Sequence, residues 1–188
     1  MSTTTLTVET PPRTLAEVFS ATGTLLKVKI PAELDHASLE SIARTHAGHP
    51  HGTCVLDLVV AHPACNPALI DLVLELGAGS SQVANTVATS GKATVEQLRA
   101  LLDSDVPSVR EHAELALLEH ELGGASGETF AEAWNRYRDH ETLGYAVRYR
   151  LATHPKTPTE ILQEIALAAD PTGEAARQRL GLSDAEHR

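Results

Sequence analysis

The sequence predicts an all-α fold, a right-handed α-α superhelix built as a short helical-repeat solenoid, with a small irregular N-terminal segment. Three observations favour this class. From Ala32 onward, apolar residues recur at helical spacing and are separated by short polar turns that contain Pro or Gly. These turns repeat along the chain. Hydrophobic residues make up 42% of the 188 residues but aromatic residues only 3%, so the core must use aliphatic side chains, which suit closely packed helices.

The first 31 residues differ from the rest. Residues 1–13 are rich in Thr and end in Pro-Pro-Arg, which predicts a loose arm, and residues 14–23 predict a short helix. In residues 24–31 apolar side chains alternate with lysines, which predicts a half-buried strand or an extended tail lying across helices. The alternating residues are Leu26, Lys27, Val28, Lys29 and Ile30.

We therefore expect an N-terminal arm over 1–31, a helical-repeat domain over 32–182 and a disordered tail over 183–188. Within the repeat domain, residues 88–98 and 152–162 agree without a gap at five of eleven positions. Residues 61–70 fit the same template of a turn, a cap and an apolar helix face, and residues 48–56 fit it more loosely. One such short helix cannot bury its apolar face alone, whereas stacked neighbours can, which predicts a solenoid.

Polar caps start the predicted helices, because Pro in the turn cannot continue the helix before it. We predict two capping boxes and one Asn-Pro cap: Thr94 with Gln97, Thr157 with Pro158 and Glu160, and Asn66 with Pro67. Core side chains are expected behind each cap, namely Leu69, Ile70, Val73 and Leu76, then Val95, Leu98, Leu101 and Leu102, and finally Ile161, Leu162, Ile165 and Leu167.

A second pattern follows the caps. Asp105 is followed by Val109 and Arg110, and Asp170-Pro171 is followed by Arg177. In these residues, and in its turns and leucine pairs, the chain resembles leucine-rich repeat variant units, relatives of HEAT-like helical repeats, over roughly residues 48–180. The turns are irregularly spaced, at His49, His62, Ser90 and His154, and residues 123–130 interrupt the series. The resemblance implies a binding scaffold whose Asp and Arg side chains tie helix ends together.

The formal charge of −10 disfavours general binding to DNA or RNA, which needs cations to displace counterions from phosphates. Two cysteines, Cys54 and Cys65, are too few for a disulfide framework, and we expect both to be small buried thiols. Residues 1–13 lack an apolar signal core, and no run approaches the roughly 18 apolar residues of a membrane span. We expect a soluble, cytoplasmic protein that does not enter a membrane.

One stretch offers potential metal ligands, His46, His49, His51 and Cys54. Their spacing matches no common zinc pattern. Three histidines of the chain precede Pro, at 49, 62 and 154, so we interpret His49 as a turn residue. We predict no metal site and no other cofactor, and keep metal binding through residues 46–54 as a second alternative function.

Catalytic motifs are absent from the sequence: there is no Gly-rich phosphate loop, nucleophile elbow or His-Glu-x-x-His. Carboxylates gather around two histidines of one predicted helix, but at positions typical of a solvated polar face. They are Glu111, Glu114, Glu119 and Glu121, around His112 and His120. We predict that the chain is not an enzyme.

Residues 130–150 differ in composition from the rest. Five of the six aromatic residues lie there, and four arginines against Asp139 and Glu141 give residues 134–150 a charge of +2, which leaves −12 on the remainder. We interpret Phe130 and Trp134 as core residues and expect the Tyr and Arg side chains to be exposed, on two helices around the turn at 140–144. Tyr, Trp and Arg dominate binding hot spots.

We therefore predict a scaffold for protein–protein interaction, self-association included, with residues 130–150 as its contact surface. The candidate binding residues are Trp134, Arg136, Tyr137, Arg138, Tyr145, Arg148, Tyr149 and Arg150. The alternative is a HEAT-like nucleic-acid binder that uses the local patch 134–150, with arginines on phosphates and aromatic rings stacked on bases.

Overall fold

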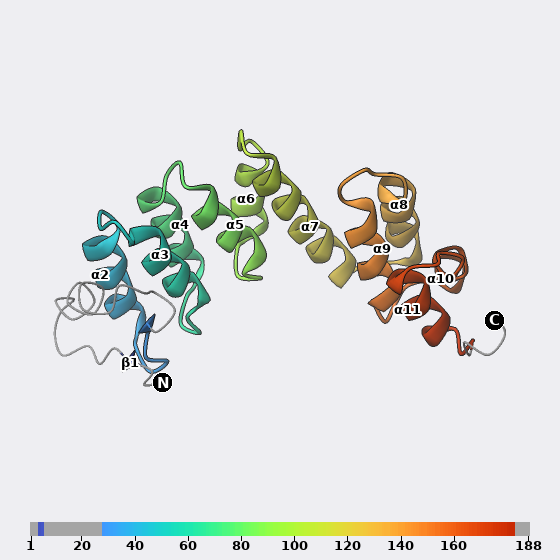
Figure 1. The fold of residues 1–188 in the computed structure, drawn as a ribbon, viewed down its shortest axis with the longest axis horizontal. Helices are drawn as coiled ribbons and strands as arrows, with labels where there is room; N and C mark the ends of the chain where they lie inside the picture. Colours follow the sequence, from blue (N-terminus) through green and yellow to red (C-terminus); the bar gives the residue numbers. More distant parts are fainter. Residues whose placement is uncertain (1–3, 6–27, 183–188) are drawn as a thin grey trace. The chain divides into compact units, whose positions relative to one another are not determined.

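The computed structural model describes residues 4–5 and 28–182, which are mostly helical (Figure 1). Within these ranges lie ten α-helices and one pair of two-residue strands, so the predicted all-α class is confirmed. No helix of the described ranges has the length and apolar character needed to cross a membrane. The helix predicted over 14–23 and the tail predicted over 183–188 lie outside the described residues.

The two strands form a short parallel pair. β1 (Thr4–Thr5) pairs with β2 (Val28–Lys29), with Thr4 opposite Val28. β2 lies inside the segment 24–31, for which a strand or an extended tail was predicted, so extended backbone is confirmed for these two residues.

The described helices form two compact units, which divide between Ala113 and Glu114, inside one helix. The first unit contains α2 (His36–His46), α3 (Gly52–Ala61), α4 (Pro67–Leu76), α5 (Ser81–Thr89), α6 (Val95–Leu101) and the first part of α7 (Pro107–Gly123). α2 packs against α3 and α4, and α3 packs against α4 and α5. The core between these helices is aliphatic: Leu39, Ile42, Val55, Val59, Ile70, Val73, Val87 and Leu98 are all buried.

The second unit contains the rest of α7, α8 (Gly127–Tyr137), α9 (Gly144–Thr153), α10 (Thr159–Ala166) and α11 (Pro171–Arg179). α9 is its central helix, packed against α8, α10 and α11. Its core includes Leu118, Leu122, Phe130, Trp134, Val147, Leu151 and Ile165. The predicted interruption at 123–130 is brief, because α7 and α8 are joined by residues 124–126 alone.

The predicted turn residues occupy equivalent places, each in the loop after a helix. In all four, the side chain accepts a hydrogen bond from the backbone N–H two residues later, as follows: His49 Nδ1 from His51 at 3.2 Å, His62 Nδ1 from Ala64 at 3.1 Å, Ser90 Oγ from Lys92 at 3.1 Å and His154 Nδ1 from Lys156 at 3.2 Å. The side chain thus satisfies an amide in the loop between two helices. The interpretation of His49 as a turn residue is confirmed.

Two of the three predicted caps are confirmed. The Thr94 hydroxyl accepts from the Gln97 amide at 3.2 Å, and the Gln97 side chain accepts from the Thr94 amide at 2.9 Å, which completes a capping box. Asn66 accepts from the Leu69 amide at 3.0 Å at the start of α4. Each side chain satisfies one of the amides that the first helical turn leaves unpaired.

The capping box predicted at Thr157 is wrong. The buried Thr157 hydroxyl donates to the Leu151 carbonyl at 2.6 Å, so it does not cap the next helix. α10 instead begins at Thr159, after Pro158, without a side-chain cap. The Thr157 hydroxyl is buried beside the end of α9, where an unpaired polar group would be costly. It therefore bonds to the Leu151 carbonyl there and not to a backbone amide of α10.

Two of the predicted core leucines are exposed. Leu102 and Leu167 follow the last residues of α6 and α10, and Leu167 keeps 86% of its surface accessible. Both fit the helical period in the sequence, but the helix ends before them, so the period no longer directs their side chains inward. The other predicted core residues are buried or half-buried.

Candidate interaction surface

The aromatic segment folds into α8 and α9, as predicted around the turn at 140–144. On α8 the aromatic side chains face the core. Phe130 is fully buried, with its ring centroid 5.0 Å from that of His154, and Trp134 is buried with its indole N–H donating to Glu164 Oε2 at 2.7 Å. The interpretation of Phe130 and Trp134 as core residues is confirmed. Trp134 therefore cannot serve as an exposed contact residue.

The expected exposure of Tyr137 is wrong. Only 3% of its surface is accessible, and its hydroxyl donates to Glu114 Oε1 at 2.6 Å. Burial and this hydrogen bond raise the pKa of Tyr137 from 10.0 to about 12. The guanidinium of Arg136 lies 5.8 Å from the centre of the Tyr137 ring.

The sequence contains the signal for this burial. Phe130, Ala133, Trp134 and Tyr137 follow the spacing i, i+3, i+4 and i+7 and are all buried. That spacing places them on one side of a helix. The combination of Tyr, Trp and Arg suggested contact, but the helical period already distinguishes the residues of α8 that face inward from those that face solvent.

On α9 the tyrosines are exposed. Tyr145 and Tyr149 keep 48% and 47% of their surfaces accessible, and they lie one helical turn apart. At 100° per residue, Ala146, Arg150 and Thr153 share this side of the helix, whereas buried Val147 and Leu151 point the other way. We call Tyr145, Ala146, Tyr149, Arg150 and Thr153 the tyrosine face of α9.

Three of the four predicted arginines are held by carboxylates of the second unit. Arg150 Nη2 lies 2.6 Å from Glu119 Oε1, and Arg138 lies 3.5 Å from Asp139 and 3.8 Å from Glu164. Arg148 is half-buried and lies 3.5 Å from Asp170. These ion pairs compensate much of the positive charge that the sequence places between residues 134 and 150.

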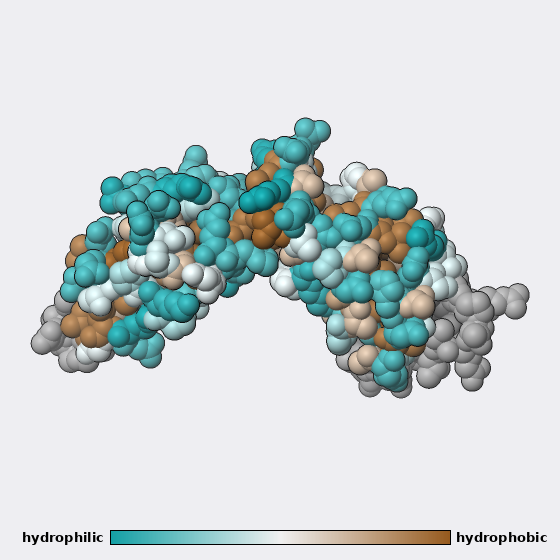
Figure 2. Space-filling model, turned by 180° about the vertical axis from the view of Figure 1, so that it is seen from behind, coloured by the Kyte–Doolittle hydropathy of each residue, from teal (hydrophilic) through white to brown (hydrophobic). Residues whose placement is uncertain are grey.

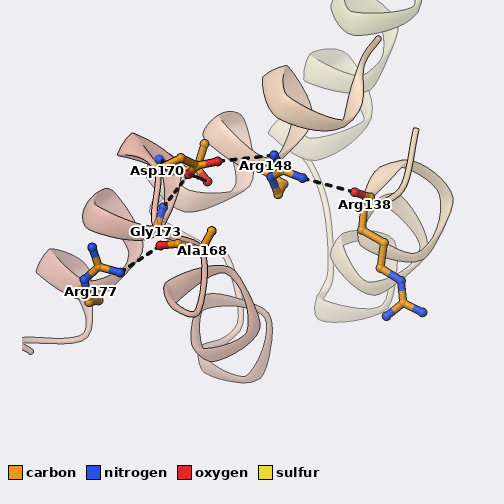
Figure 3. Close-up of polar contacts among 7 residues, drawn as sticks. Arg138, Arg148, Ala168, Asp170, Gly173 and Arg177 are labelled. Carbon is orange, nitrogen blue, oxygen red and sulfur yellow. Dashed lines mark hydrogen bonds and ion pairs between the residues drawn. The ribbon is translucent and has the colours of Figure 1, made fainter. Parts of the chain in front are cut away.

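Arg148 and Asp170 belong to a set of contacts that joins helix ends (Figure 3). Arg148 lies between the Asp170 carboxylate and the Arg138 carbonyl, which it approaches to 3.4 Å. Asp170 also caps α11 by accepting from the amides of Thr172 and Gly173. The hydrogen bond from the Thr172 hydroxyl, with those from the two amides and the nearby Arg148, lowers the pKa of Asp170.

Of the repeat-like Asp and Arg residues, Arg110, Asp170 and Arg177 contact backbone groups at or near helix ends. Arg177 donates to the carbonyls of Ala166 and Ala168 at the end of α10, and Arg110 donates to the Ser104 carbonyl at 2.6 Å. Figure 3 shows the guanidinium of Arg177 directed at the Ala168 carbonyl. These side chains are thus occupied by structural contacts.

The potential metal ligands of residues 46–54 are spread over α2, the following turn and α3. Among the residues that the structure describes, no group of three or more His, Cys, Asp or Glu side chains is arranged to hold a metal ion. Cys54 is half-buried, with the Gln82 amide 3.7 Å from its sulfur. Burial raises the pKa of the Cys65 thiol, which keeps it protonated.

The carboxylates around His112 and His120 serve different contacts. Glu114 accepts from Tyr137 and Glu119 pairs with Arg150, while His112 lies 2.8 Å from the Asn85 side chain. Sequence reasoning missed Glu119, Glu164 and Asp170 as partners of the arginines. Glu119 is 31 residues from Arg150 in the chain, so no local spacing connects the two.

On the face of the molecule that Figure 2 shows, hydrophobic residues lie in separate patches between hydrophilic ones. Among the described residues, five large hydrophobic side chains are exposed, and four of them belong to the second unit: Tyr145, Tyr149, Leu167 and Leu182, with Leu102 in the first. Comparisons with protein-family models, with curated proteins and with solved structures give no match to this chain.

Proposed function

We propose that this chain is a non-enzymatic helical-repeat scaffold that binds another protein, a second copy of itself included, through the tyrosine face of α9. The observation that carries the proposal is the exposure of nearly half of the surface of Tyr145 and of Tyr149, on the central helix of the second unit. The other aromatic residues of the segment, Phe130, Trp134 and Tyr137, are buried. Exposed Tyr side chains supply contact area at a low cost in side-chain entropy.

We also propose that the helices of each unit are repeats of an α-α superhelix. The turns at His62 and His154 support this, because they use the same hydrogen bond in different units. In both, a cation from a later segment donates to the carbonyls at the end of the preceding helix: Lys92 to Val60 and His62, and Arg179 to Ala152 and His154. Successive short helices are thereby fastened through their ends.

The ion pairs favour a protein partner over nucleic acid. A guanidinium that binds a phosphate displaces counterions from the nucleic acid, and for this it must be available to the phosphate. Arg138, Arg148 and Arg150 each lie within 4 Å of a carboxylate of their own unit. A phosphate would have to compete with these carboxylates.

The decisive experiment is photo-crosslinking from position 146, between the tyrosines, in native extract, followed by affinity measurement with the captured protein. We expect the Tyr145→Ala/Tyr149→Ala variant to bind at least tenfold more weakly, because loss of two aromatic contacts costs more than about 1.4 kcal/mol. Leu102→Ala is the matched control, since it removes an exposed hydrophobic side chain from the other unit. It should bind like the wild type.

Four outcomes would count against the proposal. A monomer by light scattering that captures no protein would remove it, as would a captured protein that binds the double variant unchanged. Binding of DNA or RNA at about 50 mM salt that weakens steeply with added salt would favour the nucleic-acid alternative. Stoichiometric metal in protein purified without a His tag would favour the metal-binding alternative.

A further inference from the structure

α11 is held against its neighbours by small side chains and polar contacts. It packs against both α9 and α10. Its buried residues are all small: Thr172, Gly173 and Ala176. Leu180, which follows the helix, is half-buried against the same core. α10, by contrast, buries the larger side chains of Ile161, Leu162 and Ile165. Because stabilisation by burial grows with the apolar area removed from water, α11 gains less from packing than α10 does.

Two arginines of α11 donate hydrogen bonds to main-chain oxygens at the ends of the neighbouring helices. Arg179 donates to the carbonyls of Ala152, at 3.2 Å, and Pro155, at 3.0 Å, at and after the end of α9. Arg177 donates to the carbonyl of Ala166, the last residue of α10, at 2.7 Å. These contacts fasten the second half of α11 to both helices.

The polar contacts of α11 can be exchanged for water. Arg179 is exposed, and the ion pair of Arg148 with Asp170, at the start of α11, leaves 28% and 33% of the two side chains accessible (Figure 3). A hydrogen bond that water can replace contributes little net free energy, and a solvent-accessible ion pair contributes less. Release of α11 therefore costs less than release of a helix that buries large apolar side chains.

We propose that α11 opens and recloses as one unit, while α9 and α10 stay folded. Elements with little apolar burial open locally, at a lower free energy than the unfolding of the whole structure. Opening uncovers the sides of α9 and α10 against which α11 packs, in a core that contains Leu151, Ile165 and Ala176. α11 is thus a lid over part of the core of the second unit. This proposal does not depend on the proposed protein partner.

The test is amide hydrogen exchange of the full-length wild type, followed by NMR. The amides of Ala176 and Leu180 should share one level of protection, at least about tenfold below that of Val147 and Leu151 in α9. Urea below the unfolding transition should speed exchange in α11 less than in α9, because a local opening exposes less surface. Equal protection of the two helices would overturn the proposal. Protection that declines steadily from Ala176 to Leu180 would also overturn it, because that pattern indicates fraying of the helix end.

A variant tests what holds the lid closed. Arg179→Ala should raise the open population of α11 about tenfold, because hydrogen bonds from charged groups are stronger than those between neutral ones. Exchange in α9 should not change. Arg44→Ala is the matched control, since Arg44 pairs with Glu40 within α2 of the other unit. It should leave exchange in α11 as in the wild type.

The proposal fails if Arg179→Ala leaves exchange in α11 unchanged, or if it speeds exchange in α9 and α11 equally. The measurement on the wild type decides the matter if Arg179→Ala does not fold.

Discussion

Tyr137 differs from the other two tyrosines of the chain in the surroundings of its hydroxyl group. Its phenol is buried and donates to Glu114, whereas Tyr145 and Tyr149 are half exposed. Burial raises the pKa of Tyr137 to about 12, because the folded chain disfavours the phenolate. The folded state gains stability by keeping this phenol protonated. The gain is present below about pH 10 and is lost as the pH rises towards 12.

We therefore predict a late phase near pH 12, which belongs to Tyr137, in an alkaline titration followed by tyrosinate absorbance. Tyr137→Phe should remove this late phase, whereas Tyr145→Phe should leave it in place. Glu114→Ala should move the late phase to lower pH, because the hydrogen bond to Glu114 is one cause of the raised pKa. A late phase that persists in Tyr137→Phe would contradict this assignment.

At the scale of the helix, two glycines mark where a new helix starts against the end of the one before. A Cβ at Gly52 would overlap the Ala47 carbonyl, and a Cβ at Gly173 would overlap the Ala168 carbonyl. The sequences around them correspond, since His49-Pro50 precedes Gly52 as Asp170-Pro171 precedes Gly173. Both first turns therefore pack directly onto backbone, which cannot move aside as a side chain can.

Gly173→Ala should accordingly destabilise the protein by more than the roughly 1–3 kcal/mol typical of overpacking. Gly123→Ala is the matched control, because no atom lies within 4 Å of a Cβ placed there. Ala has the better helix propensity, so the control should be neutral or slightly stabilising. Urea unfolding of both variants measures the difference. Equal stability of the two variants would show that α11 can start without this close approach.

The helix starts also show how far local patterns determine an element. Thr94 and Gln97 form the capping box that their spacing predicts, while the Gln97 amide nitrogen also donates to the Pro67 carbonyl and to Asp71. Thr157 has the same local signal, yet its hydroxyl serves the Leu151 carbonyl. Leu167 follows the apolar period but comes after the end of α10. Tertiary partners and helix length decide these cases, and neither can be derived from a window of a few residues.

At the scale of the whole chain, the all-α class follows from composition and period, but the division into two units does not. It falls inside α7, which runs unbroken from Pro107 to Gly123, so no Pro, Gly or polar turn marks it in the sequence. The sequence allows the exposure of the tyrosine face to be predicted, but not the partners of its arginine. The contrast between the exposed tyrosines of α9 and the buried aromatic residues of α8 follows from helical spacing, whereas the carboxylates that hold the arginines come from distant parts of the chain.

Because each unit has its own core, we predict that the two units respond separately to heat. Calorimetry should show Gly52→Ala lowering the transition of the first unit and Gly173→Ala lowering that of the second. The two variants thus serve as controls for one another. A single transition that both substitutions shift equally would mean that α7 couples the units into one cooperative structure.

The cations at the helix junctions explain one property of the sequence. Lys92 and Arg179 donate hydrogen bonds to main-chain carbonyl oxygens, and every amino acid supplies such an oxygen. The sequences of neighbouring segments can therefore diverge without loss of these hydrogen bonds. Residues 88–98 and 152–162 agree at only five of eleven positions, yet Ser90 and His154 form the same turn hydrogen bond in them.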